Sequence, residues 1–561
     1  MSLQETESSS AASRQSAARR GGHRPRHKSA NEVAFYRLVE AIDQAIETQL
    51  NLHFTLSLSG EDSQFTRFSQ AKIRQTGRVQ DGKIRLTLIA STSAAASGMV
   101  CEMTSEIASG MANETTASET ANETVATEKR TAAITLPFTG SFSEDWSLLQ
   151  PALTHLQQEL PDLPVDPHCV LPTRIRRDQP DSHSREVYWE SDGARLLSES
   201  ALAEKVLSPV QGLDFVGLYA GGISYRAYAD SAGRRHWFET PAFTLDYSLF
   251  SDRTDLASKS PAVKRPAAKG QAAKGQAARD QAARDQAARD QAARGQAVKG
   301  TVAGRHWQPE SYTQSIAAAE KQLALLSRPV RRVPRGSYRT YLAPTAVADL
   351  MDTLVLGGSL GESALRQGNS AFGKLAKGET VLSDLFSLEE DFTRVGIPRF
   401  NSSGEVAPAR LPIIQSGRWV NSLVNGRSAK EYNQISNGAN RQEAMRAPTV
   451  APGTLKEAEI LAQLGTGLYL SNLHYLNWSD LTAGRITGMT RYACFWVEAG
   501  EIVAPIENLR FDDDLYRFLG EALLGLSDRQ TFVPAVGTYN QRSLGGMWMP
   551  GMLIEQFRYT L

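Results

Sequence analysis

The hydrophobic pattern after the first thirty residues predicts a helix, a run of strands and a second helix. Apolar residues recur at three- and four-residue intervals at Phe35, Leu38, Val39, Ile42 and Ile46, and Asn31 can cap this helix. Alternating patterns then predict short strands at 54–58, 64–68, 72–76, 84–88 and 134–138, with a hairpin turn at Asp81-Gly82. A helix is expected over 145–160. Together these elements predict an N-terminal α+β domain over residues 31–200.

The rest of the chain continues with strands first and helices later. A central segment, 201–329, has β-rich runs at 215–219, 223–229 and 237–247, and an amphipathic helix at 315–327. From 330 to 561, helices are expected at 345–356, 454–464 and 515–524, among short strands and a hairpin around Ala499-Gly500. This order predicts a C-terminal mixed α/β-sheet domain. Regular strand–helix–strand alternation is missing, so the class is α+β and a doubly wound sheet is excluded.

Three polar stretches contain too few bulky apolar residues to fold. They are a basic tail at 1–30, an Ala/Ser/Thr/Glu-rich insertion at 92–132 and a third stretch at 251–304. The third contains Gln-Ala-Ala-Arg-Asp three times in succession at 276–290, within looser copies from 261 to 300. A period of five fits neither a helical stripe nor a heptad. We expect a disordered tail and two disordered insertions, with 261–300 acting as a dispensable linker.

Composition and charge exclude several classes of protein. Lys and Arg together number 61 and Asp and Glu also number 61, so the chain is not a globally basic nucleic-acid binder. The basic stretches 1–30 and 261–300 lack interleaved aromatic residues, which favours solvated linkers over nucleic-acid contacts. The cysteines, Cys101, Cys169 and Cys494, are too widely spaced for a disulfide framework. No apolar run approaches the about 18 residues of a membrane span, and no secretory signal is evident, so we expect a cytoplasmic protein.

Metal-binding patterns are weak in this sequence. None of the nine histidines is followed by glutamate, so the His-Glu helix of zincin-type proteases is absent. We interpret His23 and His27 as part of the basic tail, and His168-Cys169 and His474 as structural residues. The run Asp512-Asp513-Asp514 resembles a helix N-terminus more than a cation site.

One short motif suggests a nucleophile. Gly357-Gly358-Ser359-Leu360-Gly361 fits the G-x-S-x-G elbow that exposes a catalytic serine between a strand and a helix. The only later histidine is His474, a parallel α/β context is missing, and the glycines are explained more simply as the end of the helix that reaches residue 356. A metal-independent serine hydrolase using Ser359 therefore remains an alternative, and the ending of a helix is the favoured interpretation.

An ordered series of segments in the C-terminal half is similar to a known family. The segments lie at 344–350, 368–372, 400–404, 417–420, 428–432, 436–441, 466–469, 488–491 and 498–502. In this order they resemble the TldD/PmbA family, also called modulator-of-DNA-gyrase proteins, which is a metallopeptidase family. The resemblance is strong over 330–561 and weaker over 31–91 and 133–250.

The resemblance implies a subunit of a two-chain protease. The family implies a dimer of related chains enclosing a peptide-digesting chamber in the bacterial cytosol, in which a TldD-like chain holds zinc through H-E-x-x-x-H on a helix and a late cysteine. Here the corresponding helix, 347–354, has no His or Glu, and no cysteine follows Cys494. The chain therefore resembles the PmbA/TldE-like member, with no catalytic or metal-binding residue of its own.

The expected partners follow from this resemblance. They are a TldD-like catalytic chain, which would carry the zinc in a heterodimer, and an unfolded peptide that adds as a strand to a sheet edge. The aromatic residues Trp419, Tyr475, Trp478 and Trp548 are available as partner anchors, but each could equally belong to the core. A stand-alone regulatory binder, of a topoisomerase or of nucleic acid, is the alternative that is not an enzyme.

Overall fold

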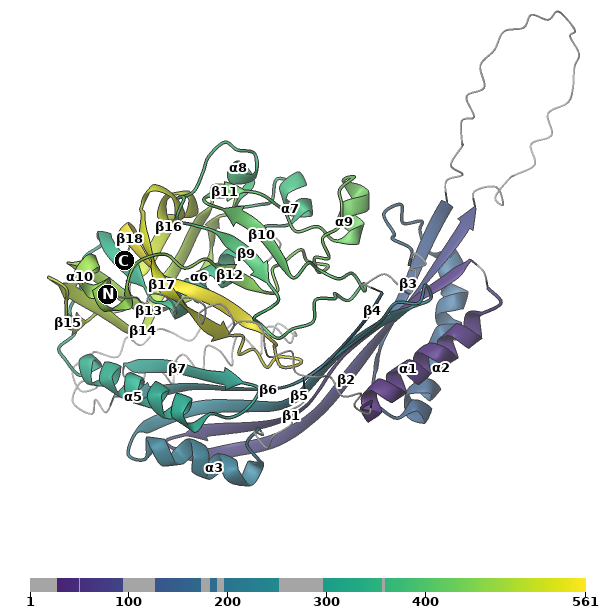
Figure 1. Ribbon diagram of the computed structural model, residues 1–561, viewed down its shortest axis with the longest axis horizontal. Coiled ribbons are helices and arrows are strands. Elements are labelled where there is room, and N and C mark those ends of the chain that lie inside the picture. The colour runs from purple at the N-terminus through teal and green to yellow at the C-terminus, as the bar shows by residue number, and fades with distance from the viewer. Residues whose placement is uncertain are drawn as a thin grey trace, which may run out of the picture.

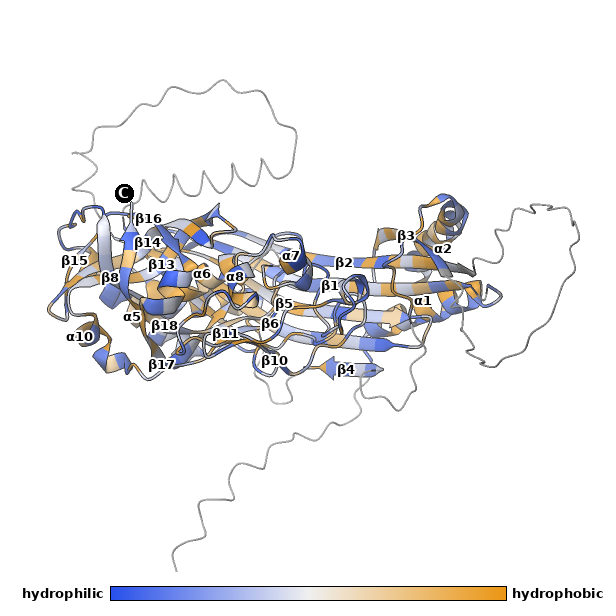
Figure 2. Cartoon of the chain, turned by 90° about the horizontal axis from the view of Figure 1, so that it is seen from above, coloured by the Kyte–Doolittle hydropathy of each residue, from blue (hydrophilic) through white to orange (hydrophobic). Residues whose placement is uncertain are grey.

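Two β-sheets organise the chain, and each carries its own helices (Figure 1). The computed structural model describes residues 28–49, 51–93, 127–172, 182–188, 196–251, 296–355 and 359–560. Figure 2 shows the first sheet running lengthwise, with helices α1 (Ala30–Ile46) and α2 (Phe142–Glu159) at one end and the second body at the other. The expected α+β class is confirmed by this arrangement.

The first sheet has seven strands, and most of its neighbouring pairs are antiparallel. In spatial order it contains β3 (Thr127–Pro137), β2 (Lys72–Ser93), β1 (Leu52–Ser69), β5 (Asp214–Asp230), β6 (Arg235–Phe250) and β4 (His183–Val187), and β7 (Ala297–Gly304) also pairs with β6. β4 is parallel to β6. Because β1 pairs with β5, the sheet combines strands from both sides of residue 200, where the sequence suggested a domain boundary.

In the described part of the chain, four α-helices accompany this sheet: α1 (Ala30–Ile46), α2 (Phe142–Glu159), α3 (Glu199–Leu207) and α5 (Pro309–Leu326). The apolar stripe expected in α1 is confirmed, since Phe35, Leu38 and Ile42 are fully buried. The N-cap is Ser29, whose hydroxyl accepts a hydrogen bond from the Glu32 amide at 3.2 Å. The proposal of Asn31 as the cap is therefore wrong, because Asn31 already lies within the helix.

The hairpin turn expected at Asp81-Gly82 is wrong. β1 and β2 are long continuous strands, and the chain turns at Gln70-Ala71, both of which have positive φ. Gly82 instead lies within β2, paired with Gly60 of β1. A Cβ at Gly60 would lie 2.3 Å from the ring of Tyr225, so this glycine makes room for a buried aromatic ring.

The second body is built on an eleven-stranded sheet in which β18 has the most neighbouring strands. Its strands are β8 (Gly336–Leu342), β9 (Leu388–Asp391), β10 (Arg410–Gln415), β11 (Arg418–Trp419), β12 (Pro448–Val450), β13 (Gly467–Asp480), β14 (Arg485–Glu498), β15 (Glu501–Pro505), β16 (Arg510–Asp514), β17 (Leu523–Pro534) and β18 (Gly546–Tyr559). β18 pairs with β12, β16, β17 and β8, and its pairing with β8 closes a circuit through β16, β14 and β13. The largest hydrophobic cluster lies in this body.

Helices in the second body are short except for one. They are α6 (Pro344–Val355), α7 (Glu362–Arg366), α8 (Gly373–Ala376), α9 (Gly426–Glu431) and α10 (Ile460–Leu464). The hairpin around Ala499-Gly500 is confirmed, with both residues at positive φ. The helices expected at 454–464 and 515–524 are mostly wrong. The first is reduced to a 3-10 turn at Glu457–Glu459 followed by α10, and the second to a short helical turn at 515–521 that includes the π-helix Arg517–Glu521.

Two stretches assigned to disordered insertions contain strands. Residues 127–132 begin β3, and residues 297–304 form β7, where Val298 is 1% exposed and Lys299 pairs with Asp246 at 3.4 Å. β7 is short and contains two glycines, and it directly follows the repeat, so its composition did not distinguish it from the stretch predicted to be disordered. Apart from these strands and a few flanking residues, the expectations for 1–30, 92–132 and 251–304 lie outside the described residues.

Deletions that differ by five residues should separate the repeat from the strand. Removing 261–295 should leave the melting temperature within about 2 °C, because the segment has one bulky apolar residue, Val263, and loop length changes stability slowly. Residues 252–260 would still bridge Ser251 and Gln296, which are hydrogen-bonded at 3.1 Å. Removing 261–300 should lower the melting temperature by more than about 5 °C, because it deletes half of β7. Equal melting temperatures for the two variants in calorimetry would contradict this.

Candidate functional site

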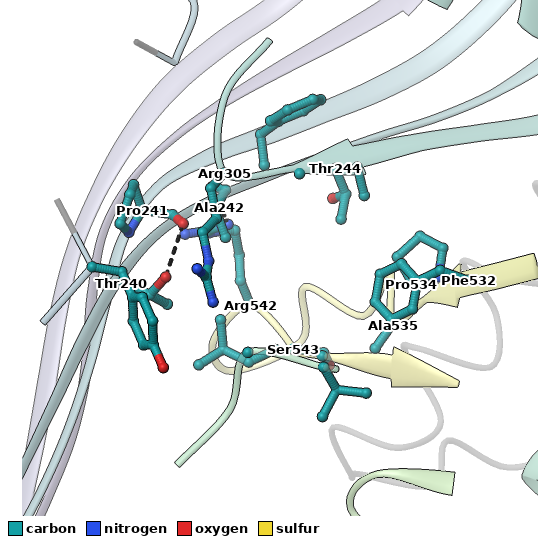
Figure 3. Close-up of a pocket in the computed structure, with 18 of the residues that line it drawn as sticks. Thr240, Pro241, Ala242, Thr244, Arg305, Phe532, Pro534, Ala535, Arg542 and Ser543 are labelled. Atoms are coloured by element: carbon teal, nitrogen blue, oxygen red, sulfur yellow. Dashed lines mark hydrogen bonds between the residues drawn. The ribbon is translucent and has the colours of Figure 1, made fainter. Parts of the chain in front are cut away.

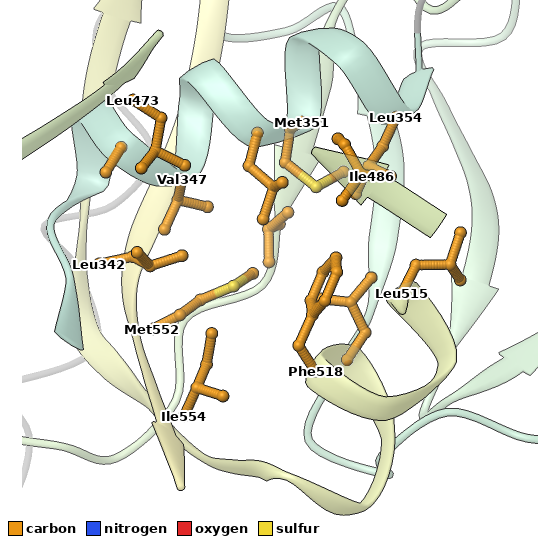
Figure 4. Packing of buried hydrophobic residues seen from close by; sticks show 14 of the residues in the cluster. Leu342, Val347, Met351, Leu354, Leu473, Ile486, Leu515, Phe518, Met552 and Ile554 are labelled. Atoms are coloured by element: carbon orange, nitrogen blue, oxygen red, sulfur yellow. The ribbon is translucent and has the colours of Figure 1, made fainter. Parts of the chain in front are cut away.

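The helix that the family resemblance identifies as the zinc helix is α6, and here it is a core helix. Val347, Leu350, Met351 and Leu354 are all fully buried. Figure 4 shows α6 packing onto Leu342, Met552, Ile554 and Phe518, which come from β8, β18 and the turn before β17. The face that would have to carry zinc ligands and a catalytic base on α6 is thus occupied by aliphatic packing.

The ligand-type side chains on α6 are two aspartates, Asp349 and Asp352. The Asp349 carboxylate accepts hydrogen bonds from the Leu473 amide at 2.9 Å and from Asn472 Nδ2 at 3.3 Å, which ties α6 to β13. Asp352 is exposed. These residues do not fit a His-Glu-x-x-x-His zinc site. Within the described ranges, no group of three or more His, Cys, Asp and Glu side chains is placed to hold a metal ion.

Burial raises the pKa of Asp349 from the usual 3.8 of an aspartate to about 6, despite the hydrogen bonds from Leu473 and Asn472 and the charge of Lys299. Because the folded protein holds the Asp349 proton more tightly than the unfolded chain does, protonation of Asp349 stabilises the fold. This stabilisation is complete below pH 3.8 and is lost as the pH rises to about 6. We expect Asp349→Asn to be more stable than the natural protein at pH 7 by about 1–3 kcal/mol, with the difference vanishing near pH 4. Urea unfolding at pH 4, 5, 6 and 7 measures it, and a difference that does not depend on pH would contradict the assignment.

Ser359 lies between two helices and is buried. Ser359 is only 4% exposed, and its carbonyl accepts a hydrogen bond from Ser370 Oγ at 2.5 Å. α6 ends at Val355 and α7 begins at Glu362, so a helix precedes the motif where an elbow requires a strand. Gly357 and Gly358 lie outside the described residues. Burial and the preceding helix both disfavour Ser359 as a nucleophile.

His474 and Cys494 have structural surroundings, as the sequence suggested for the histidine. The His474 ring lies 3.9 Å from that of Tyr475, and burial, with the charges of Arg491 and Lys299, lowers its pKa to about 4. Cys494 is buried and its thiol donates to the Arg491 carbonyl at 3.1 Å. Burial raises the pKa of this thiol to about 11, which disfavours the thiolate that zinc would require.

The acidic run 512–514 ends strand β16 and directly precedes the helical turn at 515–521. Asp514 Oδ1 accepts a hydrogen bond from the Tyr516 amide at 2.8 Å, so Asp514 does occupy the N-terminus of a helical turn, as the sequence suggested. Asp512 pairs with Arg485 at 2.6 Å, and Asp513 pairs with Arg517. Their carboxylates are directed to different arginines, and the run forms no shared cation site. The pair His168-Cys169 lies beside α9, where Asp166 pairs with Arg427 at 2.6 Å; His23 and His27 lie outside the described residues.

The four aromatic residues considered as partner anchors are unequally available. Trp419, Trp478 and Trp548 are partly buried and pack against the hydrophobic clusters of the second body. Tyr475 is 52% exposed and has positive φ within β13. Tyr475 is therefore the one of these four with a largely accessible ring.

A buried arginine joins the second body to the middle of the first sheet. Arg542 lies between β17 and β18, and its guanidinium donates to Glu61 Oε2 at 3.2 Å, Ser63 Oγ at 2.7 Å, the Ala242 carbonyl at 2.8 Å and Ser224 Oγ at 3.1 Å. Arg542 and Glu61 are each 3% exposed. These contacts reach β1, β5 and β6, so one side chain fixes the position of the 535–545 loop on the sheet.

Beside Arg542, the two bodies line a cavity of about 450 Å³ that is open to solvent (Figure 3). One wall is the stretch of β6 between its two edge partners, since β4 pairs with 235–239 and β7 pairs with 243–250. Tyr188 and Arg305, which directly follow β4 and β7, flank this opening, and the Arg305 guanidinium lies 3.9 Å from the centre of the Tyr188 ring. The opposite wall comes from 392–396, 532–535 and 542–545.

The described side chains that line this cavity include three arginines and no carboxylate. The arginines are Arg305, Arg394 and Arg542, and the apolar part of the wall includes Phe243, Phe392 and Phe532. No motif in the sequence predicted this site, because its residues come from separate strand ends and loops. Only the tertiary structure brings them together.

Comparison with known proteins identifies the C-terminal domain. Residues 335–560 match the PmbA/TldA metallopeptidase C-terminal domain. A search of curated protein sequences gave no match. No helix in the described part of the chain has the length and apolar character to cross a bilayer.

Solved structures share the fold over nearly the whole chain. A structure of TldE from Thermococcus kodakarensis is 12% identical, with a TM-score of 0.64, and the match covers 94% of this chain and 100% of that one. A "putative modulator of a DNA gyrase" from Thermotoga maritima is also 12% identical, with a TM-score of 0.62 and the same coverage. A similarly named protein from Bacteroides thetaiotaomicron is 13% identical, with a TM-score of 0.60 and coverage of 93% and 97%.

At identities of 12–13%, the similarity to solved structures shows a shared fold only. The family match of the C-terminal domain is what shows a family relationship. The expectation drawn from the ordered segments between 344 and 502 is confirmed. The C-terminal domain of this chain, residues 335–560, belongs to the TldD/PmbA family.

Proposed function

We propose that this chain is a TldE-like, non-catalytic subunit of a TldD/TldE-type zinc metalloprotease complex that acts on unfolded peptides in the cytoplasm. The observation that carries the proposal is the packing of α6. In place of zinc ligands and a base, it directs Val347, Leu350 and Met351 into the core. A chain that keeps the family fold with this helix in the core supplies surface, while a TldD-like partner supplies the zinc and the catalytic base.

The remaining polar groups near α6 support the same proposal. Asp349 is engaged with the backbone of β13, and the Cys494 thiol donates to a backbone carbonyl. Both groups therefore stabilise the fold around the helix. The buried position of Ser359 argues against the serine-hydrolase alternative.

The first sheet offers an edge for an extended peptide. Within the described ranges, β3 pairs with β2 along one side, from Thr127 to Pro137, and has no strand on the other side. The Lys129 carbonyl at the start of this edge already accepts a hydrogen bond from the Asp166 amide at 2.7 Å. The rest of the strand can bind a peptide through main-chain hydrogen bonds, which tolerate many side chains. Such tolerance suits a protease complex that processes unfolded segments.

Complex formation with a TldD-like chain from the same genome tests the proposal. Mixed at micromolar concentration, the two purified chains should elute as one complex in size-exclusion chromatography, because a stable dimer buries about 1,200 Å² or more. Zinc analysis of the separated chains should find the metal with the TldD-like chain. Separate elution of the two chains, or one tightly bound zinc per copy of this chain, would contradict the proposal.

A further inference from the structure

We propose that the cavity between β6 and the 535–545 loop binds the C-terminal carboxylate of a peptide whose last side chain is apolar. This inference rests on the proposed function and deepens it, since it gives this subunit a substrate-binding site. The cavity volume of about 450 Å³ lies within the range of about 300–1,000 Å³ that is typical of small-molecule sites.

The charge of the cavity favours an anion. Arg542 is neutralised by Glu61, and its donors are directed to the sheet. Arg305 and Arg394 lie at the wall with different partners: Arg305 stacks on Tyr188, and Arg394 stacks on Trp548 at 3.9 Å and donates to Gln530 Oε1 at 2.7 Å. A guanidinium that stacks on a ring keeps in-plane N–H groups for a carboxylate.

Arg305 is also held in place across the opening. A Cβ added to Gly396 would lie 2.7 Å from Arg305 Nη2, so the guanidinium rests against the backbone of the opposite wall. Gly396 has a φ of +64°, which glycine adopts without strain. The side chain is thus positioned before a ligand arrives, which reduces the entropy lost on binding.

The apolar part of the cavity wall favours a ligand that carries an apolar group beside its carboxylate. Phe243, Phe392, Phe532, Val395 and Leu544 line the cavity beside the arginines. Burying an apolar side chain against such a wall contributes to affinity in proportion to the area removed from water. A compact inorganic anion would leave this surface uncovered, whereas a carboxylate next to an apolar side chain uses both parts.

The β6 stretch at the opening favours a chain end over a passing strand. Pro241 has no N–H to donate, its carbonyl accepts from Thr240 Oγ1 at 3.1 Å, and the Ala242 carbonyl accepts from Arg542. A peptide strand added here would therefore meet few available backbone groups. A terminal residue requires none of them, because its carboxylate is held by the arginines.

Calorimetric titration of the purified full-length chain tests the inference with three probes: acetyl-Ala-Ala-Phe with a free carboxylate, the same peptide amidated, and 3-phenylpropanoate. The acid peptide should bind about tenfold or more tightly than the amide, because the amide loses the charge-assisted hydrogen bonds that the arginines donate to the carboxylate. It should also bind more tightly than 3-phenylpropanoate. Equal binding of acid and amide, or no binding of the acid peptide, would overturn the inference. Tighter binding of 3-phenylpropanoate than of the acid peptide would contradict a peptide C-terminus as the ligand and would indicate a small free carboxylic acid instead.

Single substitutions locate the site. Arg305→Gln and Arg394→Gln should each weaken the acid peptide by about tenfold, and Arg485→Gln, whose exposed ion pair with Asp512 lies away from the cavity, should leave it unchanged. Unchanged binding by both cavity variants would overturn the inference. The comparison of acid with amide needs no variant, so a folding defect leaves the test intact. No TldD-like chain is present, so this binding and complex formation succeed or fail separately.

Discussion

Arg542→Met should lower the free energy of unfolding by about 3–5 kcal/mol, because it leaves Glu61 buried without its cationic partner. The hydrogen bonds from Arg542 to Ser63, Ser224 and the Ala242 carbonyl would be lost together. Methionine keeps much of the length of the side chain, so the loss reports mainly on charge and hydrogen bonding. Urea unfolding at pH 7 measures it.

A matched pair elsewhere separates burial from charge. Arg485→Met breaks the ion pair with Asp512, where the arginine side chain is 50% exposed, and should cost less than about 1 kcal/mol. Adding Glu61→Leu to Arg542→Met should recover part of the loss, because no unpaired charge then remains buried. Similar losses for the two arginine variants would show that Arg542 does not fix the two bodies together.

Leu350→Ala should lower the free energy of unfolding by about 2–5 kcal/mol, which is the cost of a cavity in a closely packed core. Leu350 is fully buried on α6, the helix that the proposal treats as structural. Asp352→Ala on the exposed side of the same helix should change stability by about 0.5 kcal/mol or less. Chemical unfolding of both variants measures the contrast. A small effect at Leu350 would mean that α6 is not packed as described, and would remove the main support for a non-catalytic role.

Local patterns predicted the elements that depend on local sequence. The stripe from Phe35 to Ile46 identified α1, because one apolar face at helical spacing has few other structures available. The hairpin at Ala499-Gly500 followed from a short turn between apolar strands. Asp81-Gly82 carries the same kind of turn signal, but the turn predicted there does not form. Gly82 lies within β2, near Tyr225 of β5. Such a contact, distant in sequence, leaves no local trace.

Other features depended on tertiary contacts from the start. β7 follows the repeat and shares its small residues, yet Val298 and Val302 pair with Leu249 and Leu245 of β6, which precede the repeat. The Arg542–Glu61 pair joins residues 481 positions apart. The sequence identified α6 as the helix to inspect and the absence of His and Glu from it. It could not predict the arginine-lined cavity, whose walls come from strand ends in both bodies.

The central claim is that this chain is required by a TldD-like partner and performs no chemistry of its own. Casein digestion tests it most directly, with the TldD-like chain alone, this chain alone, and both mixed in equal amounts, each with and without a zinc chelator. We expect cleavage only in the mixture, and we expect the chelator to abolish it. Full activity of the TldD-like chain by itself, or chelator-sensitive cleavage by this chain by itself, would contradict it.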